Sequence, residues 1–169
     1  MSTPTPIGLC PPTRVARWWP APIRLIVGYG FLAHGLAKLA HGEDRFAHIL
    51  GALRLPAADA LAWMTVGVEI LGGLAVLAGA LTPLVVWPMA VVLIVAIVTV
   101  HLPNGFSSIK LQSVDAAGAH FGQPGYETDL LYLAGLLALL VGGAGPLSLD
   151  EAIARRLRAR PRTPGDQSG

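Results

Sequence analysis

Hydrophobic positions along this 169-residue chain form four long runs, and shorter polar stretches separate them. The runs fall at about residues 21–41, 59–81, 83–102 and 126–143. Each has about twenty residues, and at 1.5 Å per residue a helix of that length crosses the roughly 30 Å hydrocarbon core of a bilayer. The pattern therefore predicts an all-α fold, an integral membrane four-helix bundle with short connections.

The connections predict how the spans are arranged. In residues 42–58, apolar side chains recur at helical spacing among charged ones, which predicts an extra interfacial amphipathic helix between spans one and two. Its apolar face comprises Phe46, Ile49, Leu50 and Leu53. The link at Thr82–Pro83 is so short that spans two and three should be antiparallel neighbours. Residues 103–125 form the longest polar connection.

The same pattern divides the chain into three segments. Residues 1–20 are predicted as a flexible tail, residues 21–150 as the membrane domain, and residues 151–169 as a basic tail. Asp59 is predicted as the N-cap of span two. Ser148 begins an S-x-x-E capping box for a basic helix after span four.

Composition excludes an ordinary soluble domain, and charge predicts the orientation. Hydrophobic residues make up 53% of the chain and charged residues only 13%, against about 25% charged in soluble proteins. The net charge of +2 does not indicate a nucleic-acid partner, because the arginines gather in the N-terminal flank and in the C-terminal tail. Such flanks are typically cytoplasmic, so we expect both termini on the cytoplasmic side of a bacterial-type inner membrane. The single cysteine, Cys10, excludes an intrachain disulfide.

Ionisable side chains inside the hydrophobic runs mark a candidate site, because such groups are costly in a membrane. His34 and Lys38 are four residues apart and share one face of span one. Glu69 lies ten residues into span two, about 15 Å deep. It is too short to reach the surface, so it is either paired with His34 or Lys38, or protonated. His101 ends span three and Glu127 begins span four, so all four spans send an ionisable group into the outer half.

Structural alternatives stand beside this interpretation. Arg24 is expected to extend to the lipid headgroups as an orientation anchor. Lys38 can also extend outward, and a buried ion pair can simply hold helices together. Asp129 is expected only to complement the dipole at the start of span four. The His and carboxylate spacings form no compact ligand motif, so we expect no metal.

Five short strings, in order, resemble the DoxX family of small four-helix membrane proteins. They are R-L-x-x-G-x-x-F-x-x-H-G-x-x-K-L from Arg24, V-E-I-L-G-G-L from Val68, H-x-P-N-G-F from His101, G-Y-E from Gly125 and G-P-L-S-L-D from Gly145. The resemblance covers roughly residues 22–150. It implies an association with membrane oxidoreductase systems, including quinone-linked sulfur oxidation and small redox complexes with soluble partners. The family positions that carry over are Arg24, His34, Lys38, Glu69, His101 and Glu127.

Three functions follow from these observations. In the first, the chain is a quinone-linked redox subunit without a cofactor of its own; the candidate catalytic residues are His34, Lys38 and Glu69, and His101 and Glu127 complete the quinone-binding site. In the second, it is a non-enzymatic anchor that docks a protein partner, or a second copy, through residues 103–125. In the third, it is a small carrier or proton pathway with Glu69 at its centre.

Overall fold

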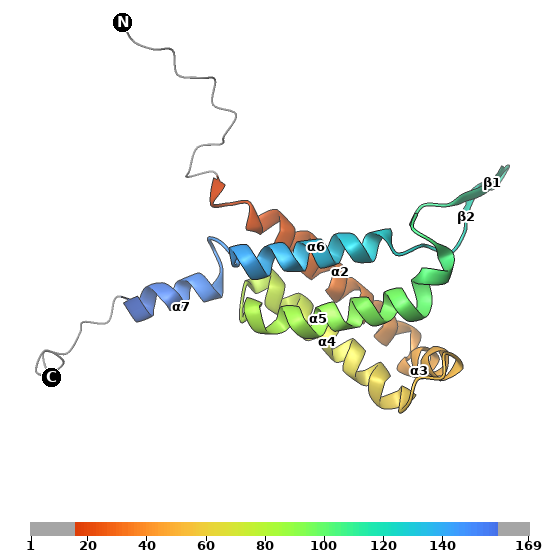
Figure 1. Ribbon diagram of the computed structural model, residues 1–169, viewed down its shortest axis with the longest axis horizontal. Coiled ribbons are helices and arrows are strands. Elements are labelled where there is room, and N and C mark those ends of the chain that lie inside the picture. Colours follow the sequence, from red (N-terminus) through yellow and green to blue (C-terminus); the bar gives the residue numbers. More distant parts are fainter. Residues whose placement is uncertain (1–15, 159–169) are drawn as a thin grey trace, which may run out of the picture.

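The computed structural model describes residues 16–158, except for the side chain of Glu43 (Figure 1). Its α-helices are α2 (Pro20–His41), α3 (Glu43–Ala52), α4 (Ala58–Ala78), α5 (Thr82–Ala96), α6 (Glu127–Gly142) and α7 (Leu149–Arg158). A π-helical turn, η1 (Ile97–His101), and a 3-10 turn, η2 (Leu102–Asn104), extend α5, and strands β1 (Leu111–Asp115) and β2 (Gly118–Phe121) precede α6. Cys10, with most of the predicted N-terminal tail, lies outside the described residues, as do residues 159–169.

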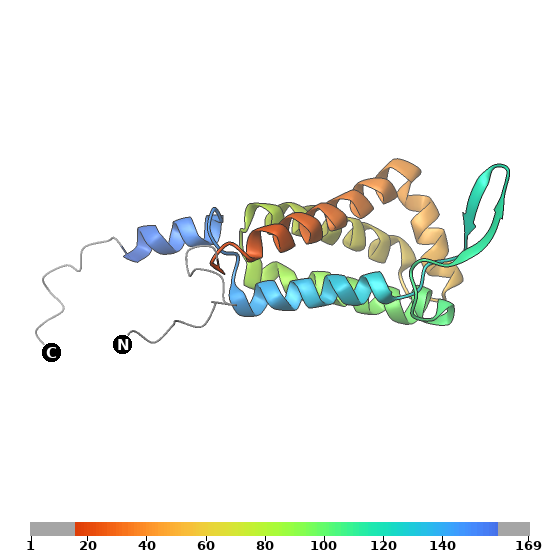
Figure 2. The same cartoon turned by 90° about the horizontal axis from the view of Figure 1, so that it is seen from above.

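Helices α2, α4, α5 and α6 lie side by side with alternating directions (Figure 2). The most extensive contact is between α2 and α4; α4 also contacts α5, α5 contacts α6, and α6 returns to α2. We call the end where α2 begins and α6 ends the α7 end, since α7 extends from it. The opposite end, which carries α3 and the two strands, is the hairpin end. The predicted antiparallel packing of spans two and three is confirmed.

Three helices are long and apolar enough to cross a membrane: α2, α4 and the continuous helix Thr82–Asn104. α6 has 16 residues, and at 1.5 Å per residue it rises about 24 Å, less than the roughly 30 Å hydrocarbon core. The structure therefore supports a multi-span membrane protein with three candidate spans, and the fourth span stays a prediction. Large apolar side chains are exposed on the outside of the candidate spans, as contact with lipid allows; examples are Tyr29, Leu71 and Val98.

Glycines allow α2 and α4 to approach closely. A Cβ on Gly73 would lie 2.7 Å from the backbone nitrogen of Leu32 and 2.8 Å from the carbonyl oxygen of Gly28. A Cβ on Gly35 would lie 3.0 Å from the Cβ of Glu69. Because a side chain at Gly73 would overlap the backbone of α2, this helix separation requires glycine.

A cluster of buried apolar side chains fills the space between the four helices. It comprises Val27, Phe31, Val76, Val86, Met89, Leu93, Leu136 and Leu139. The ring of Phe31 meets the ring of Tyr132 edge to face, with 5.8 Å between the centroids, and so joins α2 to α6.

The predicted amphipathic helix between the first two spans is confirmed as α3. Its buried residues Ala47 and Leu50 pack against Ala62, close to the start of α4. Ile49, from the same predicted apolar face, is exposed. The position of α3 at a membrane surface stays a prediction.

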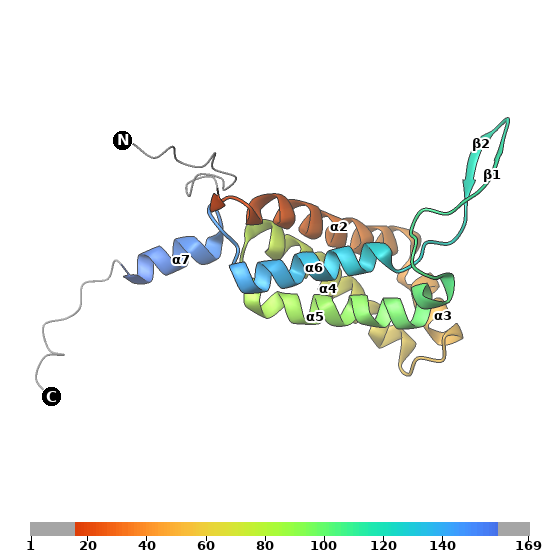
Figure 3. The same cartoon turned by 45° about the horizontal axis from the view of Figure 1, so that its top comes forward.

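The expectation of an all-α fold is wrong within residues 103–125. β1 and β2 pair as an antiparallel hairpin in which Asp115 lies opposite Gly118. Gly118 has φ 124°, a backbone conformation that favours glycine. Every strand residue is exposed, and the hairpin projects away from the helices (Figure 3). Because the strands bury no face, the sequence lacks the apolar–polar alternation that would predict them.

Two predicted helix starts have different outcomes. The prediction that Asp59 is an N-cap is wrong, because α4 begins one residue earlier, at Ala58, and Asp59 lies in its first turn. Ser148 does cap α7: its Oγ accepts a hydrogen bond from the backbone N–H of Glu151 at 3.1 Å. The Glu151 side chain does not complete the capping box, because it accepts a hydrogen bond from Arg155 Nε at 2.9 Å.

The close contact of α2 and α4 predicts a position-specific effect of adding one methyl group. Gly73→Ala should lower the free energy of unfolding by about 1–3 kcal/mol, because the added Cβ meets the α2 backbone. Thermal unfolding of the purified protein in detergent measures this loss. Gly67→Ala is the matched control on the same helix, since no atom lies within 4 Å of its added Cβ. Equal stability of the two variants would contradict the proposed close contact.

Candidate functional site

An ion pair between Lys38 and Glu69 joins α2 to α4. The Nζ of Lys38 donates to Oε1 of Glu69 at 2.5 Å, and the Glu69 side chain is only 7% exposed. The ammonium of Lys38 also lies 4.5 Å from the ring centroid of Phe46 on α3, within the range of a cation–π contact. The expectation that Glu69 is paired is therefore confirmed, with Lys38 as its partner.

The helix geometry explains how Lys38 reaches Glu69. Gly35 lies against Glu69 at the crossing of the two helices, one turn before Lys38. Side chains on an α-helix tilt toward its N-terminus, so Lys38 extends back toward this crossing. A residue with a side chain at position 35 would push α4 away and separate the charges.

The second carboxylate oxygen of Glu69, Oε2, is buried and has no hydrogen-bond partner within residues 16–158. A buried acceptor without a partner is rare and calls for an explanation. An oxygen in this state can take up a proton or accept a hydrogen bond from a bound molecule. Glu69 therefore keeps one buried acceptor atom that the described residues leave free.

His34 is not part of the ion pair. It lies one turn before Lys38 on α2, and its side chain is exposed. Of His34, Lys38 and Glu69, only Lys38 and Glu69 therefore form a pair in the described part of the chain. Because His34 and Lys38 still share one side of α2, His34 faces the surface beside the pair.

A second polar pair connects η1 to α6 at the hairpin end. The Nδ1 of His101 and Oδ2 of Asp129 share a hydrogen bond of 2.5 Å. Asp129 is buried, although it was expected only to complement the helix dipole. His101 closes a π-helical turn, and such turns often occur at functional sites because they change the direction of a side chain.

Glu127 bonds to the long connection and not to His101 within the described residues, and its expected part in the quinone-binding site stays a prediction. Its Oε2 accepts a hydrogen bond from the backbone N–H of Ser108 at 3.0 Å. The hydroxyl of Ser108 in turn donates to the carbonyl oxygen of Gly125 at 3.1 Å. Glu127 therefore fixes the ends of the long connection beside α6. Residues two apart on a helix point in nearly opposite directions, so only one of Glu127 and Asp129 can face inward.

Asp129 could not have been identified as an inward-facing residue from its helical spacing alone. It precedes Leu136 by seven residues, so the two share a face of α6, and both are buried. The predicted span is apolar on all sides, and this hides its inward face.

Arg24 is buried, and the expectation that it extends to the lipid headgroups is wrong. Its guanidinium donates to carbonyl oxygens at the C-terminal end of α4, at 3.1 Å for Val76 and 2.6 Å for Leu77. It also donates to the carbonyl oxygens of Ala144 and Pro146, in the link between α6 and α7. Arg24 thus donates to carbonyl groups at the end of α4, one of which (Val76) also accepts from the N–H of Gly79, and it joins three segments. Its effect on membrane orientation stays a prediction.

Asp150 holds the other side of this junction, a role that no sequence pattern predicted for it. Its carboxylate accepts hydrogen bonds from the backbone N–H groups of Leu81 at 2.7 Å and Thr82 at 3.0 Å. Its own N–H donates to the carbonyl oxygen of Gly79 at 2.9 Å. Asp150 therefore caps the start of α5, although it belongs to α7. This cap connects α7 to the turn between α4 and α5.

The described residues contain no group of three His, Cys, Asp or Glu side chains arranged to hold a metal ion. The structure instead brings the candidate residues together as two pairs, one between α2 and α4 and one between η1 and α6.

Substitutions of Arg24 distinguish the buried arrangement from a headgroup anchor. Arg24→Lys should lower stability by several kcal/mol, because each buried carbonyl left unpaired costs about 1–3 kcal/mol and an ammonium cannot reach all four. A headgroup anchor would tolerate lysine. Thermal unfolding in detergent measures the difference, and Arg45→Lys, at an exposed position of α3, is the control.

The Lys38–Glu69 pair predicts a non-additive double-mutant cycle. Lys38→Met alone and Glu69→Gln alone should each lower stability by roughly 3–5 kcal/mol, because each breaks a buried pair. The double variant should lose less than the sum, since neither charge is then left alone. The exposed pair Arg155 and Glu151 is the matched control, and its coupling energy should be far smaller because solvent screens both charges. Additive losses at Lys38 and Glu69 would show that the two do not interact.

Comparisons with known proteins agree with this structure. The DoxX family profile matches residues 20–102, which include α2, α4 and the helix that ends beyond His101. An uncharacterized membrane protein of Mycobacterium tuberculosis, Rv3486, is 35% identical over 145 residues, which cover 81% of this chain and 82% of that protein. No solved structure matches. The matched residues include Lys38, Glu69 and His101, and the chain belongs to the DoxX family of membrane proteins.

Proposed function

We propose that this chain is a membrane subunit or accessory of an oxidoreductase system, and that it binds a quinone beside Lys38 and Glu69. The observation that carries the proposal is the buried Glu69 carboxylate, which bonds to Lys38 through one oxygen and keeps the other without a partner within the described residues. A buried acceptor next to a cation suits a ligand that gains and loses protons.

The side chains around Glu69 fit a quinone head group. The Nζ of Lys38 and the imidazole of His34, one turn apart on α2, would each donate to a quinone carbonyl. Glu69 would hold or release a proton at Oε2. A bound quinone supplies two-electron, two-proton chemistry. The exposed apolar faces of α2 and α4 would accommodate its isoprenoid tail.

The second polar pair supports the same proposal. His101 and Asp129 would provide a proton carrier where η1 meets α6, toward the hairpin end. The sequence contains neither a CxxC nor a CxxCH motif, so electrons would come from a partner protein.

The proposed topology has four spans, with the α7 end at the cytoplasmic side of the inner membrane. α6 is apolar throughout after its first turn. A span that is slightly too short is accommodated by local thinning of the bilayer at modest cost. With an even number of spans, the arginines before α2 and those in and after α7 share one side, as the positive-inside rule requires.

Quinone binding to the purified full-length protein tests the proposal. We expect quinone to co-purify with the wild-type chain, and His34→Gln and Glu69→Gln to weaken binding by about tenfold or more, since each removes a hydrogen bond to the ligand. Quenching of tryptophan fluorescence by added quinone measures the affinity. Asp59→Asn, the same carboxylate-to-amide change at an exposed position of α4, is the control.

A second candidate function is docking of a protein partner, which the exposed hairpin favours. The His34 variant keeps the first test decisive if Glu69→Gln fails to fold, because His34 is exposed. A wild-type chain that binds no quinone overturns the proposal. If a partner then co-purifies with the intact chain but not after deletion of residues 111–121, the docking function stands in its place.

A further inference from the structure

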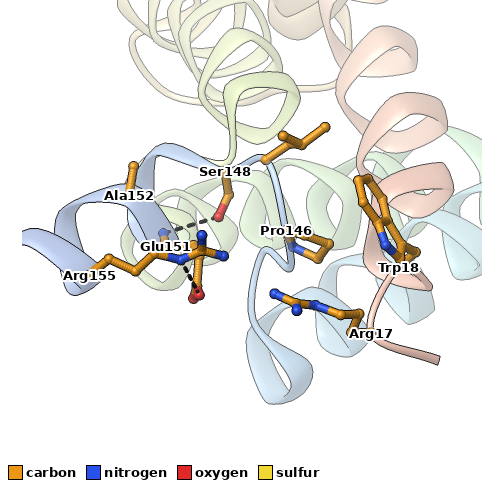
Figure 4. Close-up of a pocket in the computed structure, with 8 residues that line it drawn as sticks. Arg17, Trp18, Pro146, Ser148, Glu151, Ala152 and Arg155 are labelled. Atoms are coloured by element: carbon orange, nitrogen blue, oxygen red, sulfur yellow. Dashed lines mark hydrogen bonds and ion pairs between the residues drawn. The ribbon is translucent and has the colours of Figure 1, made fainter. Parts of the chain in front are cut away.

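A pocket of 540 Å³ lies at the α7 end, between the start of α2 and α7 (Figure 4). Arg17 and Trp18 line it from the segment before α2, and Arg155 lines it from α7. Figure 4 shows the Arg17 side chain extending toward α7. The pocket is far from Lys38 and Glu69, so what it binds is independent of the quinone proposal.

Positive charge dominates this pocket. Among its described lining residues Glu151 is the single carboxylate, and Arg155 donates to it through Nε, which leaves the two terminal amino groups of the guanidinium without a partner in residues 16–158. The pKa of Glu151 lies below its ordinary value, first because Arg155 donates this hydrogen bond and further because Arg155, Arg158 and Arg17 surround it with positive charge. Guanidinium groups bind phosphate through paired hydrogen bonds.

A second, apolar hollow of 450 Å³ lies along the first turns of α2, and its first lining residue, Pro22, follows Trp18 of the basic pocket by four residues. It is lined by Pro22, Leu25, Ile26, Tyr29 and Leu77. Pro22, Leu25 and Tyr29 fall at helical spacing on one face of α2, so the hollow follows that face away from the start of the helix. From Pro22 to Tyr29 the hollow extends about 10 Å into a span that crosses the membrane.

We infer that the two hollows together bind one anionic phospholipid, with its phosphate between Arg17 and Arg155 and an acyl chain along Leu25 and Tyr29. A free phosphate ion would use only the basic pocket, and an acidic peptide would have no reason to occupy a hollow that faces the hydrocarbon core. Trp18 and Trp19 are both exposed at this level, as is typical of side chains at the headgroup boundary. The surplus of arginine over glutamate favours an anionic headgroup over a zwitterionic one.

Native mass spectrometry of the delipidated full-length protein tests this inference with three probes. These are phosphatidylglycerol, phosphatidylcholine with the same acyl chains, and glycerol 3-phosphate. We expect phosphatidylglycerol to bind tightest, by about fivefold or more over phosphatidylcholine, since each nearby arginine contributes that much. Arg17→Gln should weaken phosphatidylglycerol binding by about fivefold. Arg156→Gln, on α7 but outside the pocket lining, is the control and should leave binding unchanged.

Glu151→Gln provides a test that misfolding cannot imitate, because removal of the only carboxylate from the pocket should strengthen phosphatidylglycerol binding. Equal binding of the two lipids, with no effect of Arg17→Gln, would overturn the inference. Binding of glycerol 3-phosphate as tight as that of phosphatidylglycerol would reduce the site to an anion pocket and remove the acyl-chain part. If an acidic peptide displaces phosphatidylglycerol and added lipid does not, the pocket belongs to a protein partner instead.

Discussion

The contact between α2 and α4 is the constraint on which the rest of this structure depends. Gly28 and Gly73 bring the two backbones together without intervening side chains. The same contact places Arg24 within reach of the last carbonyl groups of α4 at one end, and Lys38 within reach of Glu69 toward the other. Ionisable groups are tolerated here because the helix pair supplies a partner for each, which lipid cannot do.

The polar side chains at the α7 end and those toward the hairpin end differ in whether they keep atoms available to bind another molecule. At the α7 end, Arg24 and Asp150 are bound to backbone atoms on several sides, so they stabilise the junction of helices and are closed to other molecules. Toward the hairpin end, Glu69 keeps an oxygen without a partner within the described residues, and His101 is bound through one ring nitrogen only. This difference separates the structural from the chemically available residues and supports our choice of Glu69.

Most of the helical fold could be predicted from the sequence, because long apolar runs and tight links are direct signals of membrane helices. The pairing of Glu69 was also predictable, since a short carboxylate deep in a span needs a partner. The hydrogen-bond partners of Arg24, His101 and Glu127 could not be predicted, because they depend on the rotation of each helix about its axis. In α6 the apolar residues surround the whole helix, so no sequence pattern reports that rotation. The hairpin was missed because it buries nothing.

The cap that Asp150 provides to α5 has a consequence for the order of biosynthesis. The backbone N–H groups of Leu81 and Thr82 receive their acceptor from a residue made 68 positions after Thr82. Until Asp150 leaves the ribosome, the turn between α4 and α5 relies on water at the membrane surface for its hydrogen bonds. The helical hairpin formed by α4 and α5 is thus completed only after α6 has been synthesised. A chain truncated before α7 would contain α4 and α5 but would lack the hydrogen bonds by which Asp150 caps α5.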